Sequence, residues 1–169
     1  VKTNMGTNST LDYRVTERTF KSLLDKVRPG QYPRVHLLHG NMTNDELFEL
    51  YCDKSLVGLI SATRGEGYGL PMIEAAACGL PVMATNWSGH KTFLQEGSWL
   101  PLRYTLTRIP QEKADGRIFM QTSFWDDVQA PHFKKQLGAR MCCSCCLGVC
   151  VQYPMWSTSG GFAAVHILE

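Results

Sequence analysis

The segment that most restricts the fold is residues 57–62, VGLISA, which is apolar at nearly every position. A strand with one solvated face alternates apolar and polar side chains, whereas a parallel strand covered on both faces is apolar throughout. Residues 57–62 are therefore predicted to form a central strand with helices over both faces of its sheet.

Upstream of this strand, helical and strand patterns alternate. From Thr16 apolar residues recur at helical spacing until Pro29-Gly30 stops the pattern, which predicts an amphipathic helix. Residues 35–38 are a short apolar run suited to a buried strand. Residues 43–46, TNDE, have the capping-box form and open the apolar stripe of a second helix.

The same alternation continues downstream. A helix is expected to begin near Pro71 and to end at Gly79, and residues 81–85 form the next strand. Helices and strands joined by short connections predict an α/β fold, a Rossmann-like doubly wound parallel sheet.

Beyond Asn86 the pattern is weaker. A short helix is expected after Ser88-Gly89, residues 99–109 are mixed apolar and basic, and residues 131–141 form a last helix. Residues 142–169 carry glycine, serine and cysteine clusters without a period and are predicted to be a disordered tail. The chain is thus divided into one folded domain, residues 1–141, and this tail.

The composition excludes several function classes. With 169 residues and a net charge of +2, from 17 basic and 15 acidic side chains, the chain lacks the field expected of a nucleic-acid or anionic-membrane binder. No apolar run reaches the roughly 18 residues of a transmembrane segment. A soluble protein in the cytoplasm is expected, since the cysteine usage over the first part of the chain suits a reducing compartment.

The seven cysteines fall into two groups. Cys52 and Cys78 stand alone in apolar contexts and are predicted to be reduced core residues. Five others crowd into the tail, at positions 142, 143, 145, 146 and 150. Zinc is not favoured there, because the second, distant pair that closes a tetrahedral site is absent.

The glycine-rich stretch of residues 64–74, RGEGYGLPMIE, lies where the central strand ends and a helix begins, the place where open α/β sheets bind ligands. Backbone amides at a helix start hold phosphate oxygens without basic side chains. A dehydrogenase fingerprint would need glycine at position 70, which is Leu70, and the Gly-Lys-Ser/Thr of a P-loop is missing.

Two carboxylates in and after this loop indicate a different kind of ligand. Glu66 lies in the loop, whereas Glu74 lies about one turn inside the helix on the face shared with Leu70. A carboxylate accepts hydrogen bonds from neighbouring hydroxyls, which the vicinal diols of ribose and sugars supply. The loop therefore suits a sugar nucleotide; the alternative is that Glu66 is a solvated charge and Glu74 a helix first-turn acid.

Taken together, residues 66–74, EGYGLPMIE, and the following AAACGLPV resemble the donor-site signature of retaining GT-B glycosyltransferases, the group 1 or family-4-like enzymes that include sucrose and glycogen synthases. Upstream, residues 35–40 and 45–51 resemble the strand and helix before the signature. Downstream, residues 85–90, TNWSGH, resemble the next loop. The resemblance covers roughly residues 1–105, with a weaker echo at residues 125–141, and implies the C-terminal, donor-binding domain.

The resemblance implies a role for each matching residue. Glu66 would be catalytic and contact the transferred sugar, and Glu74 would bind the ribose. The remaining donor-binding residues would be Gly67, Tyr68, Gly69 and Leu70 at the sugar and diphosphate, and Asn41 and Met42 near the base. The donor would be a UDP- or GDP-sugar, with an unknown hydroxyl acceptor, retention at the anomeric carbon, and neither metal nor cofactor.

The sequence also departs from the family. The Arg and Lys that clamp the diphosphate cannot be placed, although Arg64 and Lys2 are nearby cations, and His90 follows the Ser-Gly turn on the side expected to face the ligand. A GT-B enzyme of two typical domains has about 350 residues. The chain is accordingly interpreted as a fragment without the N-terminal GT-B domain, inactive alone; the alternative is a noncatalytic α/β interaction module derived from that fold.

Overall fold

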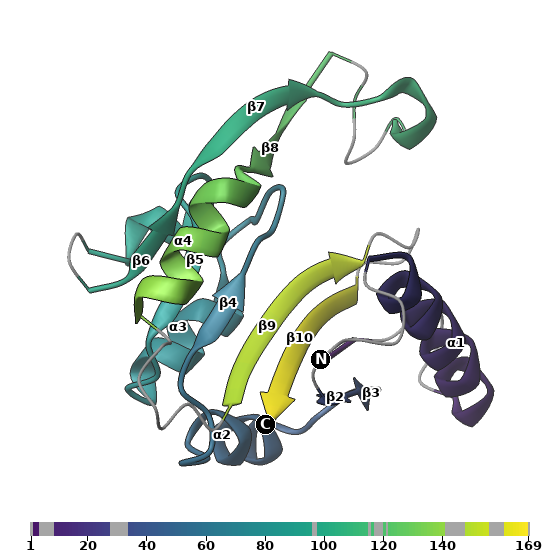
Figure 1. The fold of residues 1–169 in the computed structure, drawn as a ribbon, viewed down its shortest axis with the longest axis vertical. Coiled ribbons are helices and arrows are strands. Elements are labelled where there is room, and N and C mark those ends of the chain that lie inside the picture. The colour runs from purple at the N-terminus through teal and green to yellow at the C-terminus, as the bar shows by residue number, and fades with distance from the viewer. Residues whose placement is uncertain are drawn as a thin grey trace.

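A computed structural model describes residues 2–3, 9–27, 34–95, 98–114, 116, 120, 122–140, 148–155 and 161–168. Three parallel strands, β4 (Leu59–Ser61), β5 (Val82–Thr85) and β6 (Leu100–Leu102), lie in that order in one half of its largest sheet, with β6 at the edge. Helix α3 (Leu70–Ala77) packs on one face of these strands, and helix α4 (Ala130–Arg140) crosses the other (Figure 1).

Successive residues of β4 and β5 enter two different apolar cores. Leu59, Val82 and Ala84 face Met72 and Ala75 of α3, all at most 2% exposed. On the other face, Ile60, Met83 and Leu102 pack with Phe133 of α4. Both sheet faces are thus buried, which confirms the central strand predicted from residues 57–62 and the Rossmann-like α/β class.

The N-terminal part of the chain supplies two helices and three short strands. Helix α1 (Thr10–Val27) is longer than the sequence pattern indicated, since it begins before Thr16. The predicted strand at residues 35–38 is divided into β2 (Arg34–His36) and β3 (Leu38–His39), and β3 pairs in parallel with β1 (Lys2–Thr3).

Helix α2 (Asn44–Tyr51) begins as its sequence predicts. The Thr43 hydroxyl accepts a hydrogen bond from the Glu46 amide (3.2 Å), and a Glu46 carboxylate oxygen accepts one from the Thr43 amide (2.7 Å). This reciprocal pair satisfies two backbone donors that the helix itself leaves free, and it confirms the capping box.

The sheet continues beyond β4 in an order that the sequence did not indicate. A hairpin of β9 (Gly148–Met155) and β10 (Gly161–Leu168) lies between β4 and β2, with β9 parallel to β4 and β10 antiparallel to β2. These segments belong to residues 142–169, for which no structure was predicted. They are rich in Val, Ile, Tyr and Phe, which strands favour, but lack the alternation that reveals a strand in sequence.

A second hairpin follows β6. Strands β7 (Tyr104–Arg108) and β8 (Phe124–Val128) pair antiparallel and extend away from the central sheet (Figure 1). Two short 3-10 helices complete the described elements, η1 (Gly89–Thr92), which confirms the short helix expected after Ser88, and η2 (Gln111–Lys113).

The prediction for the two isolated cysteines was half wrong. Cys52 is exposed rather than part of the core, whereas Cys78 is partly buried and packs against it; both are reduced. They terminate α2 and α3, and burial together with hydrogen bonding to the Cys52 thiol raises the pKa of Cys78. The cysteines at positions 142, 143, 145 and 146 lie outside the described residues.

The packing of α3 against the sheet gives a first prediction. Met72 is fully buried, so Met72→Ala removes apolar contacts and leaves a cavity, which is expected to lower the free energy of unfolding by about 2–5 kcal/mol. Urea unfolding measures this difference. Met120→Ala, at a side chain that is 53% exposed, is the matched control and should shift the midpoint little; equal midpoints for the two variants would contradict the packing of α3.

Candidate functional site

The glycine-rich loop follows the carboxyl end of β4 and leads into α3, as the sequence predicts. Because β4 and β5 are parallel, the segment after β5 reaches the same edge of the sheet. The Thr85 hydroxyl at the end of β5 donates to the carbonyl oxygen of Thr63 at the start of the loop (3.0 Å). The two connecting segments, residues 62–69 and 86–90, therefore lie side by side.

Ser88 and Gly89 bind the main chain of Glu66. The Ser88 hydroxyl accepts a hydrogen bond from the Glu66 amide (3.0 Å) and donates one to the Glu66 carbonyl oxygen, which also accepts from the Gly89 amide (3.1 Å). Only glycine allows this approach at position 89, because a Cβ there would lie 1.9 Å from the carbonyl oxygen of Gly67. The sequence indicates the turn at Ser88-Gly89 but not this contact with Glu66.

The carboxylate of Glu66 lies over the amides of its own loop. The Gly69 amide donates to Oε1 of Glu66 (3.2 Å), whereas Oε2 is buried without a partner; the Tyr68 and Gly67 amides lie near enough to favour the charged carboxylate. Burial raises the pKa of Glu66, and these three amides oppose the shift. The loop thus already holds an anionic group on the backbone donors at the start of α3.

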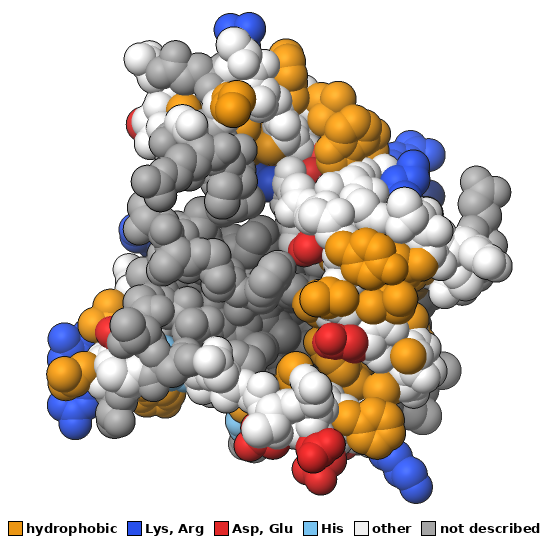
Figure 2. All heavy atoms as spheres, turned by 180° about the vertical axis from the view of Figure 1, so that it is seen from behind, with side chains coloured by type: hydrophobic (Ala, Val, Ile, Leu, Met, Phe, Trp, Pro, Cys, Tyr) orange, Lys and Arg blue, Asp and Glu red, His pale blue; other side chains and the backbone are white. Residues whose placement is uncertain are grey.

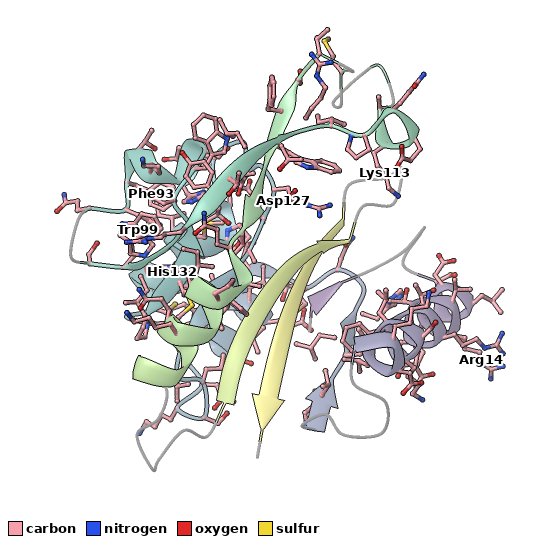
Figure 3. The ribbon with its side chains drawn as sticks, turned by 45° about the horizontal axis from the view of Figure 1, so that its top comes forward. Arg14, Phe93, Trp99, Lys113, Asp127 and His132 are labelled. Atoms are coloured by element: carbon pink, nitrogen blue, oxygen red, sulfur yellow. The ribbon has the colours of Figure 1, made fainter. Side chains whose placement is uncertain are left out.

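Of the remaining loop residues, Gly69 is required by the backbone, whereas Tyr68 and Leu70 lie on the surface. Gly69 precedes α3 with φ of 93°, and a Cβ on it would come 2.7 Å from the His90 Cβ, so glycine is required here. Tyr68 and Leu70 are exposed, and the Tyr68 ring contacts that of Phe93, which Figure 3 shows beside Trp99.

Glu74 lines a groove between α2 and α3 with a volume of about 480 Å³. Its carboxyl group is exposed, and partial burial raises its pKa. The other lining residues come from the two helices: Asn44, Asp45, Leu47, Phe48, Tyr51, Ala77 and Cys78. On the face seen in Figure 2, apolar side chains and a few carboxylates share the surface. A second cavity, of about 500 Å³, lies at the opposite ends of β4 to β6.

Asn41 and Met42 lie just before Thr43, the residue that caps α2. The Asn41 side chain is exposed and that of Met42 half-buried. Among the described residues that line the α2–α3 groove, the members nearest in sequence are Asn44 and Asp45, so Asn41 and Met42 stand beside the groove rather than in it.

The expectation that His90 faces the ligand was wrong. Its side chain is fully buried, its Nε2 lies 2.6 Å from the Thr85 carbonyl oxygen, and its ring packs edge-on against Trp99. Burial lowers the pKa of His90, so the neutral ring is the stable form inside the protein. His90 connects η1 to the end of β5 and acts as a core residue.

Strand β8 adds residues that sequence analysis missed. Arg64 donates through Nε to Asp127 (2.7 Å), and its guanidinium lies 4.3 Å from the centre of the Trp125 ring; Figure 3 marks Asp127 on this strand. The Arg64 carbonyl oxygen accepts from the amide of Asp126, which is fully buried. Arg64 is therefore held by β8 rather than freely solvated.

Two negative findings concern the described part of the chain. Its His, Cys, Asp and Glu side chains form no cluster of three or more that could hold a metal ion. None of its helices has the length and hydropathy of a membrane span.

Comparison with known proteins supports the class that the loop suggested. The family model of glycosyl transferases group 1 matches residues 21–101, a range that runs from α1 through the glycine loop to β6. Three curated proteins of Escherichia coli, each called serotype-specific mannosyltransferase WbdA, are 42% identical to this chain over 59 residues. No solved structure matches.

The matches have a limited extent. The segment shared with the mannosyltransferases is 35% of this chain and 7% of each relative, so the chain spans a small share of the proteins it resembles. Within that extent, residues 21–101 resemble glycosyl transferases of group 1.

The buried carboxyl of Asp126 gives a pH-dependent prediction. Burial raises its pKa from 3.8 to about 6, and the Thr85 hydroxyl, which lies in reach, donates to Thr63 instead. The folded protein therefore binds the proton more tightly than the unfolded chain, and stability falls as pH rises from about 4 to 6. The side chain of Asp126→Asn is neutral at all pH values. The free energy of unfolding of this variant should exceed that of the wild type by about 3 kcal/mol at pH 7.5 but by little at pH 4.

Urea unfolding at both pH values measures this difference. Asp127→Asn is the control, since it removes the neighbouring carboxyl, which is partly exposed, and its ion pair with Arg64. That loss is expected to change stability by about 0–1 kcal/mol. An effect of Asp126→Asn that is the same at pH 4 and pH 7.5 would contradict the raised pKa.

Proposed function

We propose that this chain is the donor-binding domain of a retaining glycosyltransferase, which takes a sugar from a nucleotide diphosphate and transfers it to a hydroxyl acceptor. The observation that carries the proposal is the carboxylate of Glu66 placed over the backbone amides at the start of α3, with Glu74 further along the same helix. The group 1 family match over residues 21–101 supports the same reaction class.

In the proposed complex the nucleoside occupies the α2–α3 groove. Glu74 accepts hydrogen bonds from the ribose hydroxyls, and the base lies toward the start of α2, near Asn41 and Met42. The groove volume of about 480 Å³ is of the size that small-ligand sites have. Exposure of Glu74 suits this role, because a carboxylate that binds a ligand diol must be reachable.

The diphosphate and the sugar lie at the glycine loop. The amides of residues 67–70 change partner in this complex: they release the Glu66 carboxylate and bind the diphosphate oxygens, as helix N-termini bind phosphate. The carboxylate then turns toward the transferred sugar. Backbone donors placed where the leaving diphosphate gains charge stabilise the transition state without a metal or cofactor.

The relatives' name makes mannose the first sugar to test. Because those relatives are mannosyltransferases, a nucleotide diphosphate mannose is the proposed donor, with UDP-linked sugars as the comparison. The acceptor is a hydroxyl compound that binds between this domain and an N-terminal GT-B domain. A cytoplasmic location stays a prediction.

Calorimetry with GDP-mannose and a UDP-sugar tests donor binding. The full chain is expected to bind one of them, and Glu74→Ala should weaken binding about 10- to 100-fold, since a hydrogen bond to a charged group is worth about 1.5–3 kcal/mol. Glu49→Ala, on the exposed part of α2 outside the groove, is the matched control. No binding at millimolar ligand would instead favour a noncatalytic interaction module.

Transfer is tested with radiolabelled sugar nucleotides and a panel of acceptors. The chain alone is expected to turn over little, because in a two-domain GT-B enzyme the partner domain binds the acceptor and closes the site. Rapid transfer by the isolated chain would disprove that dependence while leaving the donor site intact.

A further inference from the structure

Ser88 has a backbone conformation that its residue type disfavours. Its φ of 92° and ψ of −170° lie in a region that residues other than glycine rarely enter, and no other described non-glycine residue has a positive φ. A glycine at position 88 would adopt these angles without strain. What glycine cannot supply is the hydroxyl group.

That hydroxyl binds both polar groups of one residue. It accepts from the Glu66 amide at 3.0 Å and donates to the Glu66 carbonyl oxygen, and both bonds are partly buried. The Gly89 amide adds a second bond to the same carbonyl at 3.1 Å. Ser88 thus binds Glu66 from a segment 22 residues away, where the glycine loop by itself supplies no partner for that amide.

We propose that Ser88 is a positioning residue, whose side chain fixes the main chain of Glu66 and thereby sets where the Glu66 carboxylate can reach. Ser88 touches neither the sugar nor the diphosphate and acts only through Glu66. The expected effect on donor binding rests on the proposed function. The contact between Ser88 and Glu66 does not depend on it.

Ser88 restrains the main chain of Glu66 but not its side chain. Both bonds are to main-chain atoms, so the side-chain torsions of Glu66 are not restrained by Ser88. Without the hydroxyl, the Glu66 amide loses its partner and the Glu66 carbonyl oxygen keeps only the Gly89 amide, so the loop samples other positions. Contacts at the sugar are then weakened, whereas contacts at the ribose, which depend on α2 and α3, are unchanged.

Two variants and one control test the proposal on the full chain. Ser88→Ala removes the hydroxyl and keeps the strained angles, and Ser88→Gly removes both. Ser98→Ala is the control, because the Ser98 hydroxyl bonds only a carbonyl oxygen nearby in its own segment, that of Gln95 (2.6 Å). Two quantities are measured: hydrogen exchange of the Glu66 amide by NMR, and affinities for GDP-mannose, UDP-glucose, GMP and UMP by calorimetry.

Both Ser88 variants are expected to speed exchange of the Glu66 amide about tenfold or more, because a hydrogen bond that limits local opening is lost. Both should lower the affinity for the nucleotide-sugar that the wild type binds by about tenfold. The affinity for the matching monophosphate should stay within about twofold of the wild-type value. Ser98→Ala should change neither quantity.

The proposal is overturned if Ser88→Ala keeps wild-type protection of the Glu66 amide, or if Ser88→Gly binds the nucleotide-sugar as the wild type does. An equal loss of affinity for the nucleotide-sugar and for the monophosphate would also overturn the proposal, because it would indicate that the whole domain is destabilised. A wild type that binds no nucleotide would refute the proposed function, and the exchange measurement would still decide whether Ser88 holds Glu66.

Discussion

The parallel pairing of β4 with β5 is the constraint on which the candidate site depends. Parallel strands end at one edge of the sheet, so the loop after β4 and the segment after β5 emerge next to each other. Two hydrogen bonds join these segments beyond the strands, from Thr85 to Thr63 and between Ser88 and Glu66. The apolar run at residues 57–62, by burying both faces of β4, therefore determines where Glu66 stands.

Three ionisable groups lie at this edge: His90 and Asp126 are buried and Glu66 is half-buried. Burial raises the pKa of Glu66 and Asp126 and lowers that of His90, so in each case the neutral form is favoured. In each group hydrogen bonding opposes the shift that burial causes, and at Glu66 the opposing donors are amides of its own loop. The site thus combines a histidine whose pKa is lowered by burial with a carboxyl group whose raised pKa is opposed by backbone donors.

The sequence predicted the parts of the fold that local rules govern. The capping box at Thr43, the helix that begins near Pro71 and the doubly covered strand each follow from a pattern within a few residues. Contacts between distant segments could not be predicted in this way. Arg64 meets Asp127 only because β8 returns to the sheet edge, and Ser88 reaches Glu66 only because the segments after β4 and β5 lie side by side. His90 was misjudged because its neighbour Ser88 faces the loop, while the ring itself turns into the core.

The Glu66–Ser88 contact also suits the proposed exchange, in which a diphosphate replaces the Glu66 carboxylate on the loop amides. Ser88 and Gly89 bind the Glu66 main chain, whereas the carboxylate rests on amides that a diphosphate would bind equally well. Exchange of the carboxylate for a phosphate then requires only rotation about side-chain torsions, with no movement of the loop. Fixing the backbone lowers the entropy that such an exchange would otherwise lose on ordering the loop. The strained angles of Ser88 are consistent with this arrangement, since strain persists only where surrounding contacts hold it.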